Sequence, residues 1–139
     1  MNTTAMTPHA PGASGPTRAL TIALWVVQVA LALMFFMAGG NKLAGNPMMV
    51  GLFDTIGFGQ WFRYLTGALE VIGAAVLLVP RASGLGAVLL VPVMLGAIAT
   101  HLLVLHNSPA IPVILLGGLL FVAWNRRAQI AGLARRAND

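Results

Sequence analysis

Four apolar segments, separated by short stretches that contain polar residues or proline, dominate the hydrophobic pattern of the chain. They are Ala19 to Gly39, Trp61 to Val79, about Ala82 to Leu105, and Ala110 to Trp124. A helix needs about 20 apolar residues to cross roughly 30 Å of hydrocarbon. The first three segments reach about that length, whereas the fourth covers only about 22 Å. It must thin the bilayer, begin below the outer surface or be extended by snorkelling of the arginines that follow it. The pattern predicts an all-α fold, an integral-membrane four-helix bundle.

A further short helix is predicted in the loop between the first two segments. Asn46-Pro47 is typical of a helix N-cap followed by proline at the first helical position. The apolar residues that follow recur at helical spacing and are Met48, Met49, Leu52, Phe53 and Ile56. We expect an amphipathic helix in the first external loop, which ends at Gly57. It either anchors the chain at the membrane surface or covers a pocket of the bundle as a lid.

The sequences at the two ends differ in composition from the apolar region and divide the chain into three parts. Residues 1–17 contain prolines and almost no core-forming side chains, which predicts a disordered cytoplasmic tail. Residues 18–127 form the transmembrane domain, with a kink expected at Pro92 because one backbone hydrogen bond is lost there. Residues 128–139 form a basic cytoplasmic tail, and attraction of its arginines to anionic lipid explains it without a dedicated protein partner.

The overall composition agrees with a membrane protein and excludes several classes of function. With 58% hydrophobic residues, 8% charged residues and a mean hydropathy of +0.87, the chain has too little polar surface to cover a soluble globule. The lipid bilayer is therefore its expected partner. The net charge of +5 arises from eight Lys and Arg against three Asp and Glu, so the basicity reflects missing acids and no nucleic-acid partner is expected. The absence of cysteine excludes disulfides, thiolate catalysis and cysteine-ligated clusters.

The distribution of basic residues predicts the orientation in the membrane. In a four-span arrangement most of them fall on one side, namely Arg18, Arg81, Arg126, Arg127, Arg135 and Arg136. Only Lys42 and Arg63 fall on the other side. Because Lys and Arg are enriched in cytoplasmic loops, we expect a multi-pass protein of the plasma (inner) membrane with both termini in the cytoplasm.

Glu70 is the first candidate for a functional site. It is the only glutamate of the chain and lies in the middle of the second apolar segment. An ionisable group at membrane depth is costly unless it is paired, protonated or faces a cavity, so such residues mark ligand sites and ion paths. The alternative is a protonated carboxyl that hydrogen-bonds a neighbouring helix and only holds the bundle together. Gln28, at a similar depth in the first segment, is its expected hydrogen-bond neighbour.

Other polar residues are placed near Glu70 by helical spacing. Gln28 and Lys42 lie on one face of the first helix, and Arg63 shares the face of Glu70 on the second. His101 is expected to point into the bundle from the third helix, as a ligand-binding group or as a packing residue. We therefore predict a polar cluster of Glu70, Lys42 and His101, although straight helices would leave His101 about 13 Å above Glu70. The spacing of His101 and His106 is a weak metal signature, and no metal site is predicted.

Three short motifs, in this order along the chain, resemble the DoxX family and most closely its DoxX-like branch. They are Gly-x-x-Lys from Gly39 to Lys42, Glu-x-x-Gly from Glu70 to Gly73, and a histidine in the third segment, His101. The similarity extends from about Ala19 to Arg127. It implies a four-helix integral-membrane protein. Family members include the membrane subunit of a thiosulfate:quinone oxidoreductase, and others are linked to membrane redox complexes.

Three classes of function are compatible with these features. The first is a membrane subunit or accessory of a redox or quinone-linked system, with a polar site around Glu70, a redox protein partner and a quinone as the candidate ligand. No intrinsic cofactor is evident, and the chain is not expected to be a stand-alone enzyme. The second is a small transporter or proton-relay protein, which at this length needs a homo-oligomer to build a pathway. The third is an assembly factor that docks other membrane proteins through small-residue helix faces.

Overall fold

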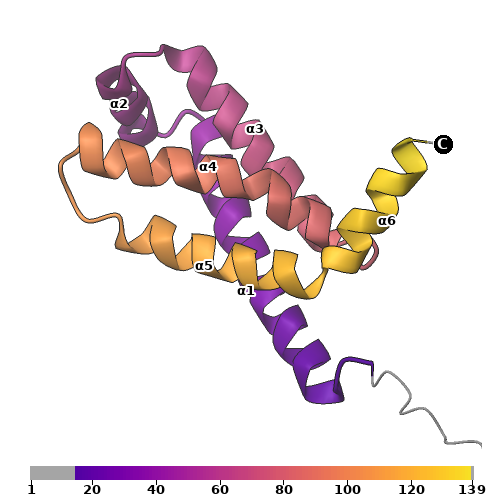
Figure 1. Cartoon of the computed structure of the whole chain (residues 1–139). Helices are drawn as coiled ribbons and strands as arrows, with labels where there is room; N and C mark the ends of the chain where they lie inside the picture. The colour runs from indigo at the N-terminus through magenta and orange to yellow at the C-terminus, as the bar shows by residue number, and fades with distance from the viewer. Residues whose placement is uncertain (1–14, 139) are drawn as a thin grey trace, which may run out of the picture.

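The computed structural model describes residues 15–138, and within this range the regular structure is entirely helical (Figure 1). The six helices are α1 (Arg18–Leu43), α2 (Pro47–Ile56), α3 (Gln60–Leu77), α4 (Ser83–Leu103), α5 (Ala110–Asn125) and α6 (Arg127–Ala137). The disordered tail predicted for the N-terminus lies, up to residue 14, outside the described residues.

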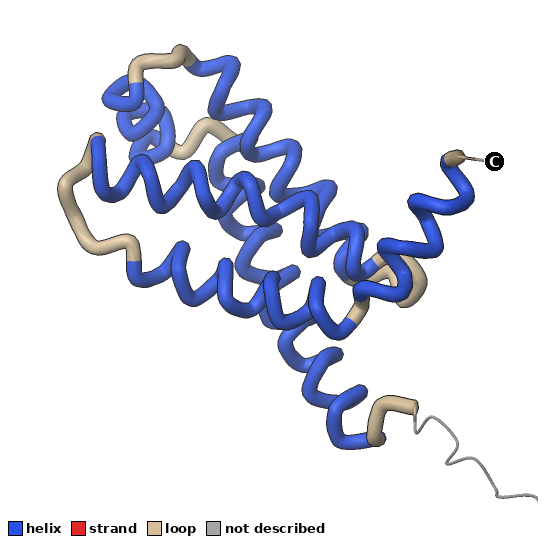
Figure 2. Tube along the Cα trace, in the orientation of Figure 1, coloured by secondary structure: helices blue, strands red, loops and turns tan. Residues whose placement is uncertain are grey.

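Four of the helices, α1, α3, α4 and α5, form the body of the protein. Consecutive helices run in opposite directions, with α3 packed between α1 and α4, and α5 packed against α4 (Figure 1, Figure 2). A less extensive contact between α5 and α1 closes the ring. The core on which the helices converge consists of Leu31, Ala32, Phe35, Ala74, Leu77, Ala87, Leu90, Met94, Leu119 and Val122. Many large apolar side chains point outward instead, as expected for helices in contact with lipid.

Helix length and composition confirm only part of the predicted membrane arrangement. Among the described helices, α1 and α4 are each long and apolar enough to cross a bilayer, and a third span results if α5 and α6 are counted together across the 66° bend between them. Arg63 and Glu70 make α3 more polar, and α5 has only 16 residues. The count of four spans therefore stays a prediction, whereas the all-helical, membrane-type fold is confirmed.

The short helix predicted in the first loop is confirmed as α2. The Asn46 side chain accepts a hydrogen bond from the Met48 backbone N–H at 3.0 Å, and Pro47 occupies the first turn. Gly57 ends the helix with φ of 83°, a left-handed conformation that glycine adopts without steric cost. The ring of buried Phe53 then contacts that of Phe62 at a centroid distance of 5.8 Å, so α2 is fixed to the first turn of α3.

The ends of the first and last helices place polar residues. The first helix continues beyond its apolar segment to Leu43, so Lys42 lies in a regular turn of this helix, as expected. The C-terminal segment, expected to be a basic tail from residue 128 onward, forms α6 up to Ala137. The side chain of Gln129 in α6 hydrogen-bonds the turn between α3 and α4 and the start of α4. These bonds fix the position of α6 on the bundle, which the basic composition of the segment did not predict.

Glycine allows close approach of α3 and α4. A Cβ atom on Gly86 would lie 2.5 Å from the backbone nitrogen and 2.9 Å from the Cα atom of Leu77. Both are backbone atoms, which cannot move aside as the end of a flexible side chain can. A Cβ atom on Gly96, in the same helix, would meet nothing within 4 Å.

We expect Gly86→Ala to lower the melting temperature in detergent, because overpacking costs about 1–3 kcal/mol and exceeds the gain in helix propensity. Gly96→Ala is the matched control and should be at least as stable as the wild type. Thermal unfolding followed by circular dichroism measures both. Equal melting temperatures for the two variants would contradict the close packing of α3 on α4.

Candidate polar site between α1 and α3

The site begins with two glycines that face each other across α1 and α3. A Cβ atom on Gly39 would lie 2.7 Å from the Gly67 carbonyl oxygen, and one on Gly67 would lie 2.9 Å from Cβ of Lys42. The two backbones therefore approach so closely that only glycine fits at these positions. This approach sets Lys42 and Glu70, one turn beyond each glycine, side by side.

Lys42 and Glu70 form a bidentate ion pair. The Lys42 Nζ donates hydrogen bonds to Oε1 and Oε2 of Glu70 at 3.0 and 2.8 Å. The Glu70 side chain is 3% exposed and that of Lys42 is 14% exposed, so water contributes little to either charge. Because a lone charge in such an environment is strongly destabilising, each residue requires the other. The structure thus brings together two members of the predicted cluster.

Arg63 lies beside the ion pair and stabilises the end of α1. Its Nη1 donates to the backbone carbonyl of Lys42, one of the last carbonyls of α1, which lack partners within the helix. Its Nε donates to Oε1 of Gln60 at 2.6 Å, and its guanidinium lies 4.2 Å from the ring centroid of Tyr64. With 3% of its surface exposed, Arg63 is a buried connector and does not extend into solvent.

Gln60 and Asp54 extend this network to α2, and neither was predicted as part of a site. The Gln60 side-chain amide donates to Oδ1 of Asp54 at 2.6 Å and to the carbonyl of Val50 at 3.1 Å. Asp54 could have been found as one of the three acidic residues of the chain, inside the short helix predicted in the first loop. Gln60 gave no such signal, because an isolated glutamine at a helix start is common.

Gln28 does not take the place expected for it beside Glu70. Its amide nitrogen donates to the carbonyl of Leu77 at 3.1 Å, and its Oε1 accepts from Nη2 of Arg126 at 3.3 Å. Leu77 is the last residue of α3, so its carbonyl has no partner within the helix and is available to a side chain. Seven residues, or about 10 Å of helix, separate Leu77 from Glu70. Gln28 therefore belongs to a second polar region at the opposite end of the bundle.

His101 also has a partner of its own. Its Nδ1 lies 2.6 Å from Oδ1 of Asn107, in the loop that joins α4 to α5. No hydrogen bond among residues 15–138 connects His101 to Lys42 or Glu70. Within these residues, hydrogen bonds join only Lys42 and Glu70 of the predicted cluster. Pro92 lies inside α4, which continues from Ser83 to Leu103.

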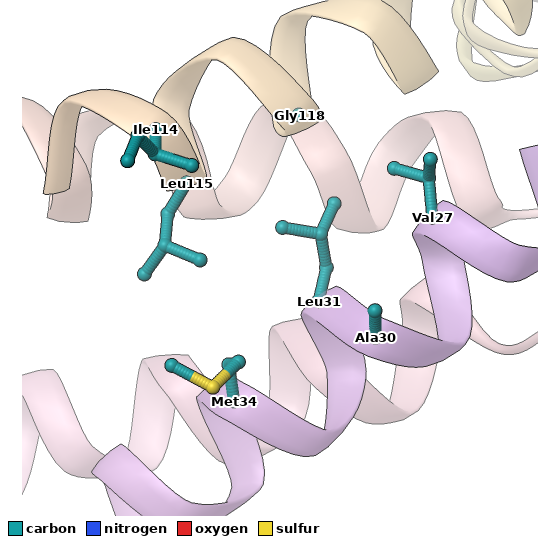
Figure 3. Close-up of a pocket in the computed structure, with 7 residues that line it drawn as sticks. All are labelled: Val27, Ala30, Leu31, Met34, Ile114, Leu115 and Gly118. Carbon is teal, nitrogen blue, oxygen red and sulfur yellow. The ribbon is translucent and has the colours of Figure 1, made fainter. Parts of the chain in front are cut away.

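A shallow apolar groove of about 250 Å³ lies between α1 and α5 (Figure 3). Its lining residues are Val27, Ala30, Leu31 and Met34 from α1, and Ile114, Leu115 and Gly118 from α5. Figure 3 shows the side chains of the two helices on opposite sides of this space. None of them carries a polar group, so the groove can hold a hydrocarbon chain but offers nothing to a polar headgroup.

The ion pair is suited to binding a ligand through a hydrogen bond, because Lys42 retains a donor. A lysine ammonium has three N–H donors, and Glu70 accepts from two of them. The third has no partner among the described residues and is available to an acceptor atom on the partly exposed side of Lys42. In the same part of the chain, no group of three or more histidine or acidic residues is arranged to hold a metal ion.

The fold and this buried ion pair define a small helical membrane protein. A family model described as the DoxX-like family matches residues 26–124, and the chain belongs to this family. The matched range includes Lys42, Glu70 and His101, in agreement with the resemblance found in the sequence. Comparison with curated proteins and with solved structures gave no match.

We expect Lys42→Met to destabilise the protein in detergent by about 3 kcal/mol, because it leaves the Glu70 carboxylate buried without a partner. The double variant Lys42→Met, Glu70→Gln should recover part of this loss, since the amide carries no charge to desolvate. Thermal or denaturant unfolding of the wild type, the two single variants and the double variant gives the coupling energy. Strictly additive losses would contradict an energetically coupled pair.

Proposed function

We propose that the protein is a membrane subunit or accessory of a redox or quinone-linked system and has no stand-alone catalytic activity. One observation carries this proposal: the Lys42 ammonium is held by Glu70 and keeps one N–H donor for a ligand. A fixed donor in a nearly dry site suits a carbonyl oxygen, the acceptor that a quinone ring presents. Pairing with Glu70 also places a counter-charge 2.8 Å from the lysine nitrogen inside the protein.

The apolar groove supports the same choice of ligand. A membrane quinone joins a polar ring to a long hydrocarbon tail, and the tail requires an apolar surface at membrane depth. The groove between α1 and α5 offers such a surface, and its residue Met34 lies eight residues, or about 12 Å of helix, from Lys42. In this proposal Lys42 binds the ring and the groove holds part of the tail.

Transport or proton relay receives less support from the positions of the polar groups. The Lys42–Glu70 network lies near the α2 end of the bundle, and the bonds of Gln28 lie near the α6 end. Between them lie apolar core residues, including Ala32, Phe35 and Ala74. A proton would have to cross this layer without a titratable group, which is why the site is better suited to binding than to conduction.

For the membrane arrangement we propose four spans in the plasma membrane with both termini in the cytoplasm. In this arrangement α3 crosses the bilayer because its polar residues pack against neighbouring helices and not against lipid. The short α5 crosses because charged side chains at its end snorkel to the interface. The excess of arginine at the α6 end supports this orientation.

Topology reporters test this arrangement directly. Fusions after Asp139 and after Arg81 should report the cytoplasm, and fusions near Asn46 and Asn107 should report the external side, because most basic residues lie at the α6 end. An external C-terminus would exclude the four-span arrangement. A cytoplasmic signal at Asn107 would show that α4 or α5 fails to cross.

Binding of a quinone can be tested on protein purified from native membranes in a mild detergent. We expect solvent extraction to recover quinone with the wild type, and mass spectrometry to find a redox protein among its partners. The double variant Lys42→Met, Glu70→Gln removes the charged donor and should lose most of the quinone, by roughly tenfold if one charge-assisted hydrogen bond is lost.

The matched control is Arg135→Gln, which removes an exposed positive charge at the other end of the protein. It should retain quinone at the wild-type level. Wild-type protein that carries neither quinone nor a redox partner, but supports substrate-dependent flux in liposomes, would contradict the proposal in favour of transport. Recovery of an unrelated membrane client alone would favour an assembly role.

A further inference from the structure

A second pocket lies at the α6 end of the protein, remote from the ion pair. It has a volume of about 240 Å³, and its lining residues are Arg81, Gln129, Gly132, Leu133 and Arg136. Arg81 comes from the turn between α3 and α4, and the other four residues come from α6. Gly132 leaves this face of α6 open, since a Cβ atom there would meet nothing within 4 Å.

Gln129 holds the two sides of this pocket in a fixed relation. Its Oε1 accepts hydrogen bonds from the Ser83 hydroxyl and from the Gly84 backbone N–H, both at 3.2 Å. Its amide nitrogen donates to the carbonyl of Pro80 at 2.8 Å. One side chain thus ties α6 to the turn that carries Arg81, and both hydrogen-bonding atoms of its amide are used.

Packing on Gly84 reinforces this connection. A Cβ atom at Gly84 would lie 3.0 Å from the carbonyl oxygen of Arg126 and 3.1 Å from Cγ1 of Ile130. Ser83 and Gly84 are both buried under this contact. The bend between α5 and α6 is therefore seated on the start of α4, and the pocket is a built feature of the fold.

The arginines of this region fall into two groups. Arg126 donates to Gln28, and Arg127 donates to the carbonyl of Trp124 and lies over the Trp124 ring at 4.9 Å. Arg81 and Arg136, in contrast, are exposed and make no side-chain hydrogen bond or salt bridge within residues 15–138. The pocket therefore presents two positive groups that the described part of the protein does not neutralise.

We propose that this pocket binds a phosphate group, with Arg81 and Arg136 as its ligands and the headgroup of an anionic phospholipid as its source. Arginine forks form bidentate hydrogen bonds to phosphate oxygens, and basic pockets at the ends of membrane helices bind lipid headgroups. Leu133 adds an apolar wall on which the glycerol region of a lipid can pack. This proposal is independent of the ion pair and of the proposed quinone site.

Lipid titration of the purified full-length protein, read by native mass spectrometry, tests the site. We expect phosphatidylglycerol to bind more tightly than phosphatidylcholine, and Arg136→Gln and Arg81→Gln each to weaken phosphatidylglycerol binding by roughly tenfold. Arg135→Gln is the matched control, because it removes the same charge from the neighbouring position of the same helix but does not line the pocket. It should bind like the wild type.

The outcomes separate the possible causes of binding. An equal loss in Arg135→Gln and Arg136→Gln would show diffuse attraction to the basic helix and would overturn the proposal. In a parallel thermal-shift experiment, inorganic phosphate should stabilise the protein less than phosphatidylglycerol does. If phosphate stabilises it as strongly, and this effect disappears in Arg81→Gln and Arg136→Gln, the lipid source is wrong and the site takes free phosphate.

Discussion

The contact between α1 and α3 depends on a requirement that low dielectric imposes: a buried charge needs a partner at hydrogen-bonding distance. Desolvation costs several kcal/mol for each ion, and only close geometry with satisfied hydrogen bonds offsets it. Lys42 reaches both oxygens of Glu70 because Gly39 and Gly67 let the two backbones approach. The helix crossing and the ion pair therefore depend on each other, and α2 is attached to the same region through Arg63 and Gln60.

Much of this arrangement could be predicted from the sequence, and the physical reason is that it follows from local rules. Apolar segment lengths gave the long helices to within a few residues, and the Asn46-Pro47 cap with Gly57 gave α2. The association of Lys42 with Glu70 was also predictable, because a lone glutamate in an apolar segment needs a cation and few were available. These inferences require only spacing, propensity and the cost of buried charge.

Contacts that depend on the register between helices were not predictable in the same way. Gln28 pairs with the end of α3, since the carbonyl of Leu77, which has no partner within α3, lies opposite it. No spacing rule within one helix states which residue of the next helix lies opposite. The docking of α6 is similar, because Gln129 bonds residues that are more than 40 positions away in the chain.

The separation of the polar groups into two ends has a consequence for how the protein is built. The hydrogen bond between Gln28 and Arg126 lies at one end, where the Nε of Arg126 is buried without a hydrogen-bond partner among the described residues. The ion pair of Lys42 and Glu70 lies at the other end, with the apolar core between the two regions. Coupling between distant sites requires a shared element with two arrangements, and a close-packed apolar layer does not supply one by itself. The protein thus carries two separate polar regions. One is the paired lysine at the α2 end, and the other contains Arg81 and Arg136 at the α6 end, which have no side-chain hydrogen bond or salt bridge within residues 15–138.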